Sequence, residues 1–287
     1  MRIGIIGAGK VGGALCKSLR EVGVTVIGLT AGTEADTLAA AEKFQVKGFA
    51  SNEELAVNCD VLFLTVPDRL VGEVAGELAQ AFRNKNDVQT LQGKTFFHCS
   101  GSLGLDELQP LTELGAEIGS LHPLQSFASA DVSFQGIYMA VDGTPKAQET
   151  GEAIATVLGA QIFVVPAAER KAYHAAACFA SNYVVAAMAV AQELMSKWTP
   201  TPEAGLAALL ALFDGTARNL HQSKLAREAL TGPIARGDIN TVKAHLAVLP
   251  PKIAEVYKAL GKETICLARA NGTIDARQAE ALASALQ

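Results

Sequence analysis

Near its start the chain reads Arg2-Ile3-Gly4-Ile5-Ile6-Gly7-Ala8-Gly9-Lys10-Val11-Gly12, an apolar run that leads directly into a GxGxxG segment. The run is typical of a buried strand, and the residues that follow predict an amphipathic helix over Val11–Arg20. Each glycine has a task in such a turn: Gly7 permits the tight turn, Gly9 lets a pyrophosphate approach the backbone, and Gly12 lets the helix pack on the strand. The helix start then offers free N–H groups to phosphate. The alternative is a structural turn that binds nothing. We expect a dinucleotide to contact Gly7, Ala8, Gly9, Lys10, Val11 and Gly12.

The end of the next apolar run bears on the type of dinucleotide. NAD sites usually carry Asp or Glu about 20 residues after the glycines, where it holds the ribose hydroxyls. Here the chain reads Gly28-Leu29-Thr30-Ala31-Gly32-Thr33, and the first acids, Glu34 and Asp36, come later. The missing carboxylate leaves room for a 2′-phosphate, to which Thr30 or Thr33 could donate a hydrogen bond, although no arginine lies nearby. We expect NADP as the cofactor, with Thr30 at its site, and keep NAD as the alternative.

Apolar runs and helical stretches alternate through the first half of the chain. The strand-like runs are Arg2–Ile6, Val24–Leu29, Val61–Val66, Thr95–His98, Glu117–Leu121, Ile137–Val141 and Gln161–Val165. This alternation predicts an α/β fold with a doubly wound, parallel Rossmann sheet. The polar stretch Phe82–Gly93 is expected to be a surface insertion.

After Pro166 the pattern is helical throughout. It begins with one uninterrupted stretch, 167–198, and continues over Glu203–Leu220, Asp238–Val248, Lys252–Ala270 and Asp275–Leu286. We therefore expect two domains, a Rossmann dinucleotide-binding domain over 1–166 and an all-α domain for substrate binding and dimerisation over 167–287.

Composition narrows the function. A chain of 287 residues is long enough for two domains, and a net charge of -5 offers no basic field to a nucleic-acid backbone. The five cysteines are scattered and form neither a CxxC nor a zinc pattern, which predicts reduced thiols and no metal site. No signal peptide is evident, and the apolar run Val184–Val190 is too short to span a membrane. We expect a cytoplasmic protein that binds a small molecule rather than nucleic acid or a membrane.

Polar residues follow several predicted strands at their carboxyl ends, where open α/β sheets bind ligands. The three clusters are Thr65-Val66-Pro67-Asp68, His98-Cys99-Ser100-Gly101-Ser102 and Ser120-Leu121-His122-Pro123-Leu124-Gln125-Ser126. Ser and Asp at such places also cap helices, and capping is the favoured interpretation for Asp68. Capping does not call for a histidine, so His122 is a candidate catalytic residue. We expect cofactor contacts from Thr65, Val66, Pro67, Ser100 and Gly101, and substrate contacts from Ser102 and Gln125.

The long helical stretch carries a polar stripe. Its members, Lys171, His174, Cys178, Ser181 and Asn182, fall within about 100° of one another at 3.6 residues per turn. The rest of the segment is mostly Ala, Val, Phe and Met, which predicts burial on nearly all sides. One interpretation is a polar seam against the Rossmann domain. The other is a catalytic stripe, in which Lys171 or His174 donates a proton and Ser181 and Asn182 anchor the substrate.

A third cluster, Thr231-Gly232-Pro233-Ile234-Ala235-Arg236-Gly237-Asp238, predicts a loop that opens a helix. Arg236 could bind a substrate carboxylate with two hydrogen bonds, or it could be a surface residue beside Asp238, which would cap the helix. Thr231, Arg236 and Asp238 are the candidate substrate residues of this half.

These motifs resemble one bacterial family. The resemblance rests on the Rossmann opening and on His98-Cys99-Ser100-Gly101, Ser120 to Phe127, Tyr173-His174 with Ser181-Asn182, and Leu230-Thr231-Gly232-Pro233. That family pairs a Rossmann-like domain with a C-terminal domain of unknown function, in proteins described as NADP oxidoreductases. More distantly the chain is similar to the group of pyrroline-5-carboxylate reductase, 3-hydroxyisobutyrate dehydrogenase and ketopantoate reductase. The resemblance implies a helical domain like that of 6-phosphogluconate dehydrogenase, a homodimer formed through it, and a catalytic lysine with nearby asparagines. Lys171 and Asn182 match in kind but not in spacing.

Three functions follow as hypotheses. The first is NADPH-dependent reduction of a small oxo acid, with ketopantoate as the named candidate and pantothenate biosynthesis as the setting. The second is imine reduction of the pyrroline-5-carboxylate type, in which the proposed acid would matter little because an imine is readily protonated. The third is a sensor that binds the dinucleotide without turnover, since a fold does not fix a function.

Overall fold

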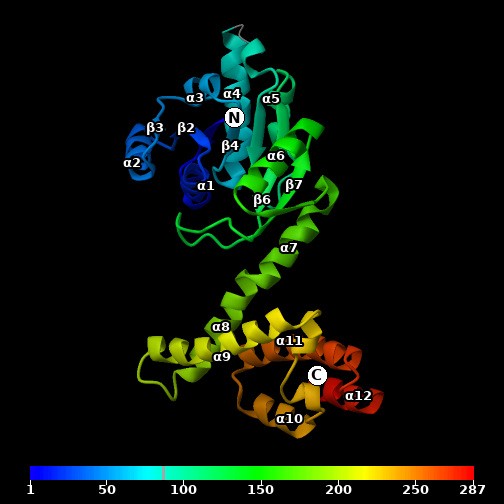
Figure 1. The fold of residues 1–287 in the computed structure, drawn as a ribbon. Helices are drawn as coiled ribbons and strands as arrows, with labels where there is room; N and C mark the ends of the chain where they lie inside the picture. Colours follow the sequence, from blue (N-terminus) through cyan, green and yellow to red (C-terminus); the bar gives the residue numbers. More distant parts are fainter. Residues whose placement is uncertain (86–87) are drawn as a thin grey trace. The chain divides into compact units, whose positions relative to one another are not determined.

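The structure, a computed structural model, describes residues 1–85 and 88–287 (Figure 1). It divides into two compact units, Met1–Asn182 and Tyr183–Gln287. The first unit therefore holds the sheet together with the first turns of the helical stretch that follows Pro166. Each unit is described by itself below.

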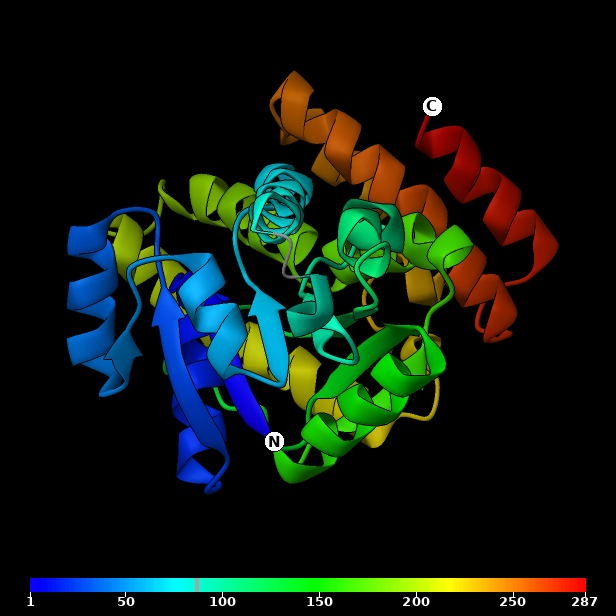
Figure 2. The same cartoon turned by 90° about the horizontal axis from the view of Figure 1, so that it is seen from above.

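The first unit is built on a sheet of eight strands in the order β3-β2-β1-β4-β5-β6-β7-β8 (Figure 1, Figure 2). The strands are β1 (Arg2–Ile6), β2 (Thr25–Thr30), β3 (Lys47–Gly48), β4 (Val61–Leu64), β5 (Thr95–His98), β6 (Glu117–Pro123), β7 (Tyr138–Gly143) and β8 (Gln161–Val164). The predicted doubly wound α/β sheet is thus confirmed.

One strand pair departs from the expected parallel arrangement. All described neighbours are parallel except β6 and β7, which pair antiparallel, with Pro123 opposite Met139. The connection between them contains no helix among its described residues, so the chain turns back at the edge where β6 ends. Parallel neighbours need a crossover to the opposite edge, usually a helix, and the sequence pattern of Ile137–Val141 alone does not reveal which route the chain takes.

Helices cover both faces of this sheet. They are α1 (Lys10–Glu21), α2 (Glu34–Phe44), α3 (Asn52–Asn58), α4 (Asp68–Asn84), α5 (Gln109–Thr112) and α6 (Pro145–Val157), with short 3-10 turns η1 (Val88–Leu91) and η2 (Leu105–Leu108). Of the predicted surface insertion over Phe82–Gly93, the first part continues α4 and the last part holds η1, while residues 86 and 87 lie outside the described residues.

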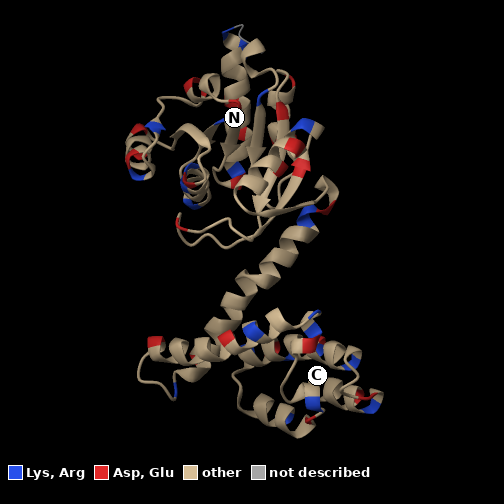
Figure 3. Ribbon diagram, viewed as in Figure 1, with Lys and Arg blue, Asp and Glu red and all other residues tan. Residues whose placement is uncertain are grey.

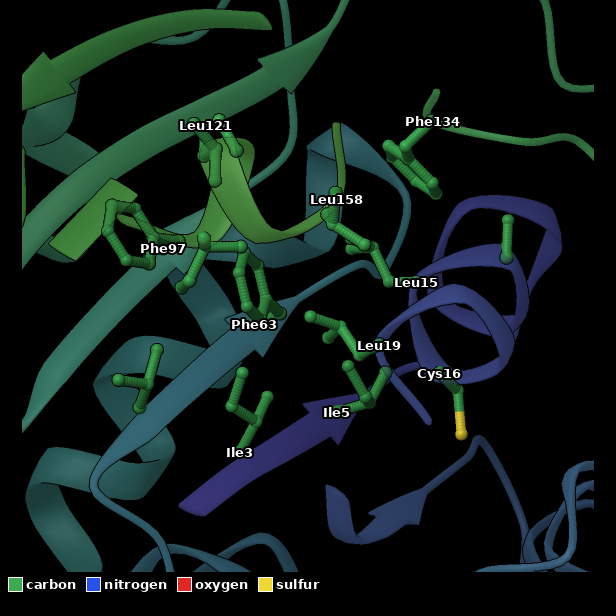
Figure 4. Packing of buried hydrophobic residues seen from close by; sticks show 14 of the residues in the cluster. Ile3, Ile5, Leu15, Cys16, Leu19, Phe63, Phe97, Leu121, Phe134 and Leu158 are labelled. Carbon is green, nitrogen blue, oxygen red and sulfur yellow. The ribbon is translucent and has the colours of Figure 1, made fainter. Parts of the chain in front are cut away.

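Alternating side chains of the strands pack into two apolar cores, one on each face. Ile5 points into the core beneath α1 and α6, which Figure 4 shows with Phe63 and Phe97, whereas the next residue, Ile6, packs on the opposite side with Leu62. This period of two is a property of the pleated strand. Burying each of these side chains stabilises the unit by about 1.5–3 kcal/mol.

The helical stretch after Pro166 is not one helix. It consists of η3 (Ala167–Glu169), α7 (Arg170–Ala180) and α8 (Asn182–Met195), interrupted at Ser181, where φ is -127° and ψ is -74°. The predicted burial on nearly all sides is also wrong: in α7 only Arg170 is buried, and no residue of α8 is. By length and composition alone, the stretch 167–195 is the one helical segment among the described residues that could cross a membrane, which by itself is weak evidence. The expectation that this region is too short to span a membrane considered only the apolar run Val184–Val190, which is a part of that stretch.

The second unit is all-helical, as predicted. It contains most of α8 and then α9 (Pro202–Gln222), η4 (Ala226–Ala229), η5 (Ile234–Arg236), α10 (Ile239–Val248), α11 (Pro251–Ala270) and α12 (Ala276–Ala285). Its core lies between the last three helices, around Val242, Ile265 and Leu282. Figure 3 shows few charged residues along α8 and α9.

Candidate functional site

The glycine loop between β1 and α1 has the geometry of a phosphate cradle. Gly7 adopts φ +97°, which favours glycine, and its N–H donates to the Thr30 carbonyl oxygen at 2.9 Å. A side chain at Gly12 would overlap the Gly7 carbonyl oxygen and the Thr65 hydroxyl, whereas the space around Gly9 is open. The three glycines therefore make the turn, the close packing and the open approach that the sequence predicted.

A cavity of about 740 Å³ lies along this loop. Gly9 precedes α1 without a side-chain cap, so the first N–H groups of the helix remain available to an anion. Of the predicted cofactor residues, Gly7, Ala8, Gly9, Lys10, Thr65, Val66 and Pro67 line the cavity. Val11 and Gly12 lie on α1 behind it, Val11 packed against the core and Gly12 fully enclosed. An extended, phosphate-bearing ligand such as a dinucleotide fits these residues.

A smaller cavity of about 280 Å³ lies at the end of β2, between the starts of α2 and α3. The Thr30 hydroxyl, buried in its wall, donates to Asn52 Oδ1 at 2.6 Å. Thr33 caps α2 by accepting the Asp36 N–H, and its hydroxyl donates to the Asp36 carboxylate at 2.7 Å. Both hydroxyls suggested for a 2′-phosphate thus already donate within the protein.

A third cavity, of about 620 Å³, lies between the end of β6 and α7, within the first unit. Among its lining residues are five that the sequence predicted, namely His122, Gln125, His174, Ser181 and Asn182. Lys171 is not among them and is exposed on the first turn of α7. Tyr173, which sequence reasoning did not assign to the site, lines the cavity as well.

The centre of this cavity is a hydrogen-bonded pair. The Tyr173 hydroxyl lies 2.6 Å from His122 Nδ1, and the two rings meet edge to face with centroids 5.5 Å apart. Burial, together with the smaller effects of nearby His174 and Arg170, lowers the pKa of His122 to about 4, so the imidazole is neutral at neutral pH. Burial raises the pKa of Tyr173 to about 12, against an opposing effect of Arg170.

Gly101 packs directly against the two histidines. A Cβ built on Gly101 would lie 2.8 Å from His174 Nδ1 and 2.9 Å from His122 Nε2. His174 Nδ1 is buried and has no hydrogen-bond partner among the described residues. Because Gly101 follows β5, the third cavity borders the same carboxyl edge of the sheet as the glycine loop, which follows β1.

The loop after β5 is held by its own hydrogen bonds. The Ser100 hydroxyl donates to Asp68 at 2.7 Å, and the Ser102 hydroxyl donates to the same carboxylate at 3.2 Å. His98, fully buried below them, accepts the Ser100 N–H and donates to the Gly104 carbonyl oxygen at 3.1 Å. The expected capping role of Asp68 is therefore wrong, because Asp68 is the first residue of α4 and its carboxylate binds this loop instead.

Arg170 is a buried residue beside the candidate site that sequence reasoning missed. Its side chain is fully buried, Nη1 donates to the Ser100 carbonyl oxygen at 3.2 Å, and Nε lies 3.8 Å from Asp142 Oδ2. Ser120 donates to the same carbonyl oxygen at 3.4 Å. Arg170 therefore fixes the backbone from which Gly101 follows. No local pattern marks it, since a charged residue in the first turn of a helix is usually solvated.

The remaining candidates lie in the second unit. Thr231 and Arg236 are exposed there, and Arg236 ends η5. Asp238 caps α10, accepting the Thr241 N–H at 3.0 Å and the Thr241 hydroxyl at 2.6 Å. Capping is thus a definite role of Asp238, and substrate binding by the three residues stays a prediction.

Two family models match the sequence. A Rossmann-like domain matches residues 1–123, and a domain of unknown function, DUF2520, matches residues 137–264. The chain therefore carries a Rossmann-like domain followed by a DUF2520 domain. This pairing of domains confirms the resemblance seen in the sequence. A comparison with curated proteins finds no match.

Solved structures share the fold over nearly the whole chain. A proposed NADP oxidoreductase from Bacteroides fragilis is 24% identical, with a TM-score of 0.73 over 92% of this chain and 97% of that one. Pyrroline carboxylate reductase from Plasmodium falciparum, solved with NADP bound, is 15% identical, with a TM-score of 0.59 over 100% and 98% of the two chains. An imine reductase from Pseudomonas sp. is 16% identical, with a TM-score of 0.61 over 99% and 91%. At these identities the chain shares their fold.

Proposed function

We propose that this protein is an NADPH-dependent reductase of a small carbonyl or imine compound, with the oxo acid ketopantoate as the first candidate substrate. The observation that carries the proposal is the cavity lined by His122, Tyr173 and His174. The two histidine rings lie against Gly101, at the same carboxyl edge of the sheet as the glycine loop. Two of the structural relatives named above are described with NADP, which supports this choice of cofactor.

The residues of the chain would bind the cofactor at the glycine loop and the substrate in the cavity beside Gly101. The glycine loop and the start of α1 would bind the pyrophosphate, and Thr65 to Pro67 would flank the dinucleotide. NADPH, when bound, supplies a hydride. The cavity beside Gly101 would hold the substrate and supply a proton, which the reduction of a carbonyl or imine also requires.

The lining of the substrate cavity informs the choice of substrate. Its described residues include no Lys, Arg, Asp or Glu, and the polar groups are histidine, tyrosine, serine, asparagine, glutamine and cysteine side chains. Such a wall can bind a carbonyl oxygen or an imine nitrogen through single hydrogen bonds. A carboxylate on the substrate would depend in this cavity on neutral donors such as Asn182.

The same proposal extends to assembly and compartment. Large apolar side chains of α8 and α9, including Val185, Leu210 and Leu212, are exposed in the chain, which supports a homodimer formed through the helical domain. Light scattering should then give twice the chain mass of 29.9 kDa, and a monomer mass would contradict the dimer.

The described cysteines are all free, which supports a reducing compartment such as the cytoplasm.

The test is NADPH oxidation with a panel of substrates: ketopantoate, other 2-oxo acids, neutral ketones and cyclic imines, each repeated with NADH. Turnover on any of them supports the reductase, and the preferred class separates oxo acid from imine. Tight NADPH binding with no turnover on the whole panel would contradict the proposal and favour a dinucleotide sensor. His174→Ala and Lys171→Ala then tell which candidate of the predicted stripe contributes, and the cavity favours His174.

A further inference from the structure

We infer that Tyr173 donates the proton in the proposed reduction and that His122 relays a proton to it. This inference rests on the proposed function and names the acid of that site. The sequence had offered Lys171 or His174 for the role, and neither makes a hydrogen bond to another ionisable side chain of the cavity in the described structure.

The position of the Tyr173 ring is fixed on two sides. It packs edge to face against Phe163 of β8, with centroids 5.8 Å apart, and against His122 of β6. The hydroxyl is held 2.6 Å from His122 Nδ1, so both the ring and its hydroxyl oxygen have a defined place at the cavity wall. A general acid needs this kind of fixed position within hydrogen-bond reach of the substrate.

The other polar groups of the cavity are less suited to the task. Serine, asparagine and glutamine side chains are weak acids that serve better as hydrogen-bond anchors, and the thiol of Cys178 is only a weak hydrogen-bond donor. Lys171 lies outside the lining. His174 remains as the competing donor, because its ring lies 6.2 Å from that of His122 and borders Gly101.

The protonation states of Tyr173 and His122 allow a proton to pass from one to the other. Because burial raises the pKa of Tyr173 to about 12, the phenol carries its proton throughout the neutral range. Because the pKa of His122 lies at about 4, its imidazole is neutral and can accept a proton at one nitrogen while it gives one from the other. The charged and titratable groups around His122 are Arg170 and His174 on α7, His98 on β5 and Asp68 on α4.

The proton steps balance as follows. When the substrate carbon accepts a hydride, the π bond to its oxygen or nitrogen breaks and that atom takes the proton of the Tyr173 hydroxyl. The resulting phenolate oxygen takes the proton from His122 Nδ1, and His122 Nε2 takes a proton from water, which leaves as hydroxide into the solvent. The net change is one hydride and one proton added to the substrate and one hydroxide released, with Tyr173 restored and His122 left neutral in its other tautomer.

The test uses Tyr173→Phe, which keeps the ring and removes only the hydroxyl. We expect kcat to fall by about 10²–10⁴-fold, the usual contribution of a general acid. The NADPH dissociation constant should stay within about twofold, because the glycine loop is untouched. Tyr138→Phe is the matched control, since Tyr138 lies outside the cavity lining and should keep the wild-type rate.

Two further readouts separate a chemical role from a structural one. With an uncharged phenol as donor, the rate of the chemical step should not fall between about pH 6 and about pH 9, whereas an imidazolium donor would lose activity over that range. In the protein without cofactor, the ring-nitrogen NMR signals of His122 should shift in Tyr173→Phe and stay unchanged in Tyr138→Phe.

The possible outcomes are distinct. If the wild type turns over a substrate and Tyr173→Phe keeps its kcat, the inference is overturned and the reductase stands. If the wild type turns over no substrate of the panel, the proposed function fails and the inference fails with it. Unchanged His122 signals in Tyr173→Phe would overturn the pair itself.

Discussion

A single methyl group at Gly101 tests the geometry on which the proposed site depends. In Gly101→Ala the new Cβ would lie 2.8 Å from His174 Nδ1 and 2.9 Å from His122 Nε2, and ordinary contact begins at 3.4 Å. Each ring must therefore retreat by about 0.5–0.6 Å, the difference between these distances. His122 cannot do so without disturbing its 2.6 Å hydrogen bond to Tyr173.

The size of the effect follows from that displacement. A shift of about 1 Å in a catalytic group can cost about 10²-fold in rate, so half of it should lower kcat by about tenfold, or about 1.4 kcal/mol of barrier. Steady-state kinetics measure kcat, and a fluorescence titration should show an NADPH dissociation constant within about twofold of wild type. Wild-type kcat together with unchanged NMR signals of both histidines would refute the packing of Gly101 against the rings.

Three further perturbations test the cofactor loop, a helix and the buried histidine. Gly12→Ala should weaken NADPH binding by more than about 100-fold, because its Cβ would overlap the Gly7 carbonyl oxygen; near-normal affinity in a titration would contradict this close packing. Gly76→Ala on α4 meets open space and should raise the free energy of unfolding in urea by about 0.5–1 kcal/mol; a loss would contradict that picture. Burial, aided by Arg170, lowers the pKa of His98 to about 4, against about 6.5 when unfolded. The contribution of His98 to the free energy of unfolding should thus be fully present above about pH 6.5 and fall by about 1.4 kcal/mol per pH unit as the pH drops towards 4. The pH dependence of unfolding should therefore be shallower by this amount in His98→Gln than in the wild type, and an unchanged slope would contradict the burial of His98.

The sequence predicted the fold well wherever the deciding signal was local. The run Arg2–Ile6 and the glycines after it specify strand, turn and helix within a dozen residues, and Gly7 and Gly12 each have a steric reason visible in the structure. The direction of β7 was not predicted, because it depends on the route of a connection without regular structure. The break at Ser181 was missed for a related reason: neither Gly nor Pro marks it, and helix propensity continues on both sides.

The residues of the candidate site likewise fall into those that could be predicted from local sequence and those that could not. Residues at strand ends, such as His122, could be found because strand ends of a parallel sheet meet at one edge. Arg170 and Tyr173 could not, because their roles come from partners far away in the chain. Arg170 is buried only because the Ser100 carbonyl oxygen and Asp142 lie behind it.

The case of Lys171 shows what helical periodicity leaves undetermined. Spacing placed Lys171 and His174 on one stripe, and their angular positions on α7 differ by only about 60°. Periodicity, however, gives the angle around the axis and not the height along it. Side chains of a helix point back towards its N-terminus, so Lys171, in the first turn, reaches away from a cavity whose first residue on α7 is Tyr173. Its neighbour Arg170 occupies the same turn but faces the sheet, where it is buried. Which residues of α7 line the cavity is therefore decided by where α7 begins against the sheet, and that contact is tertiary.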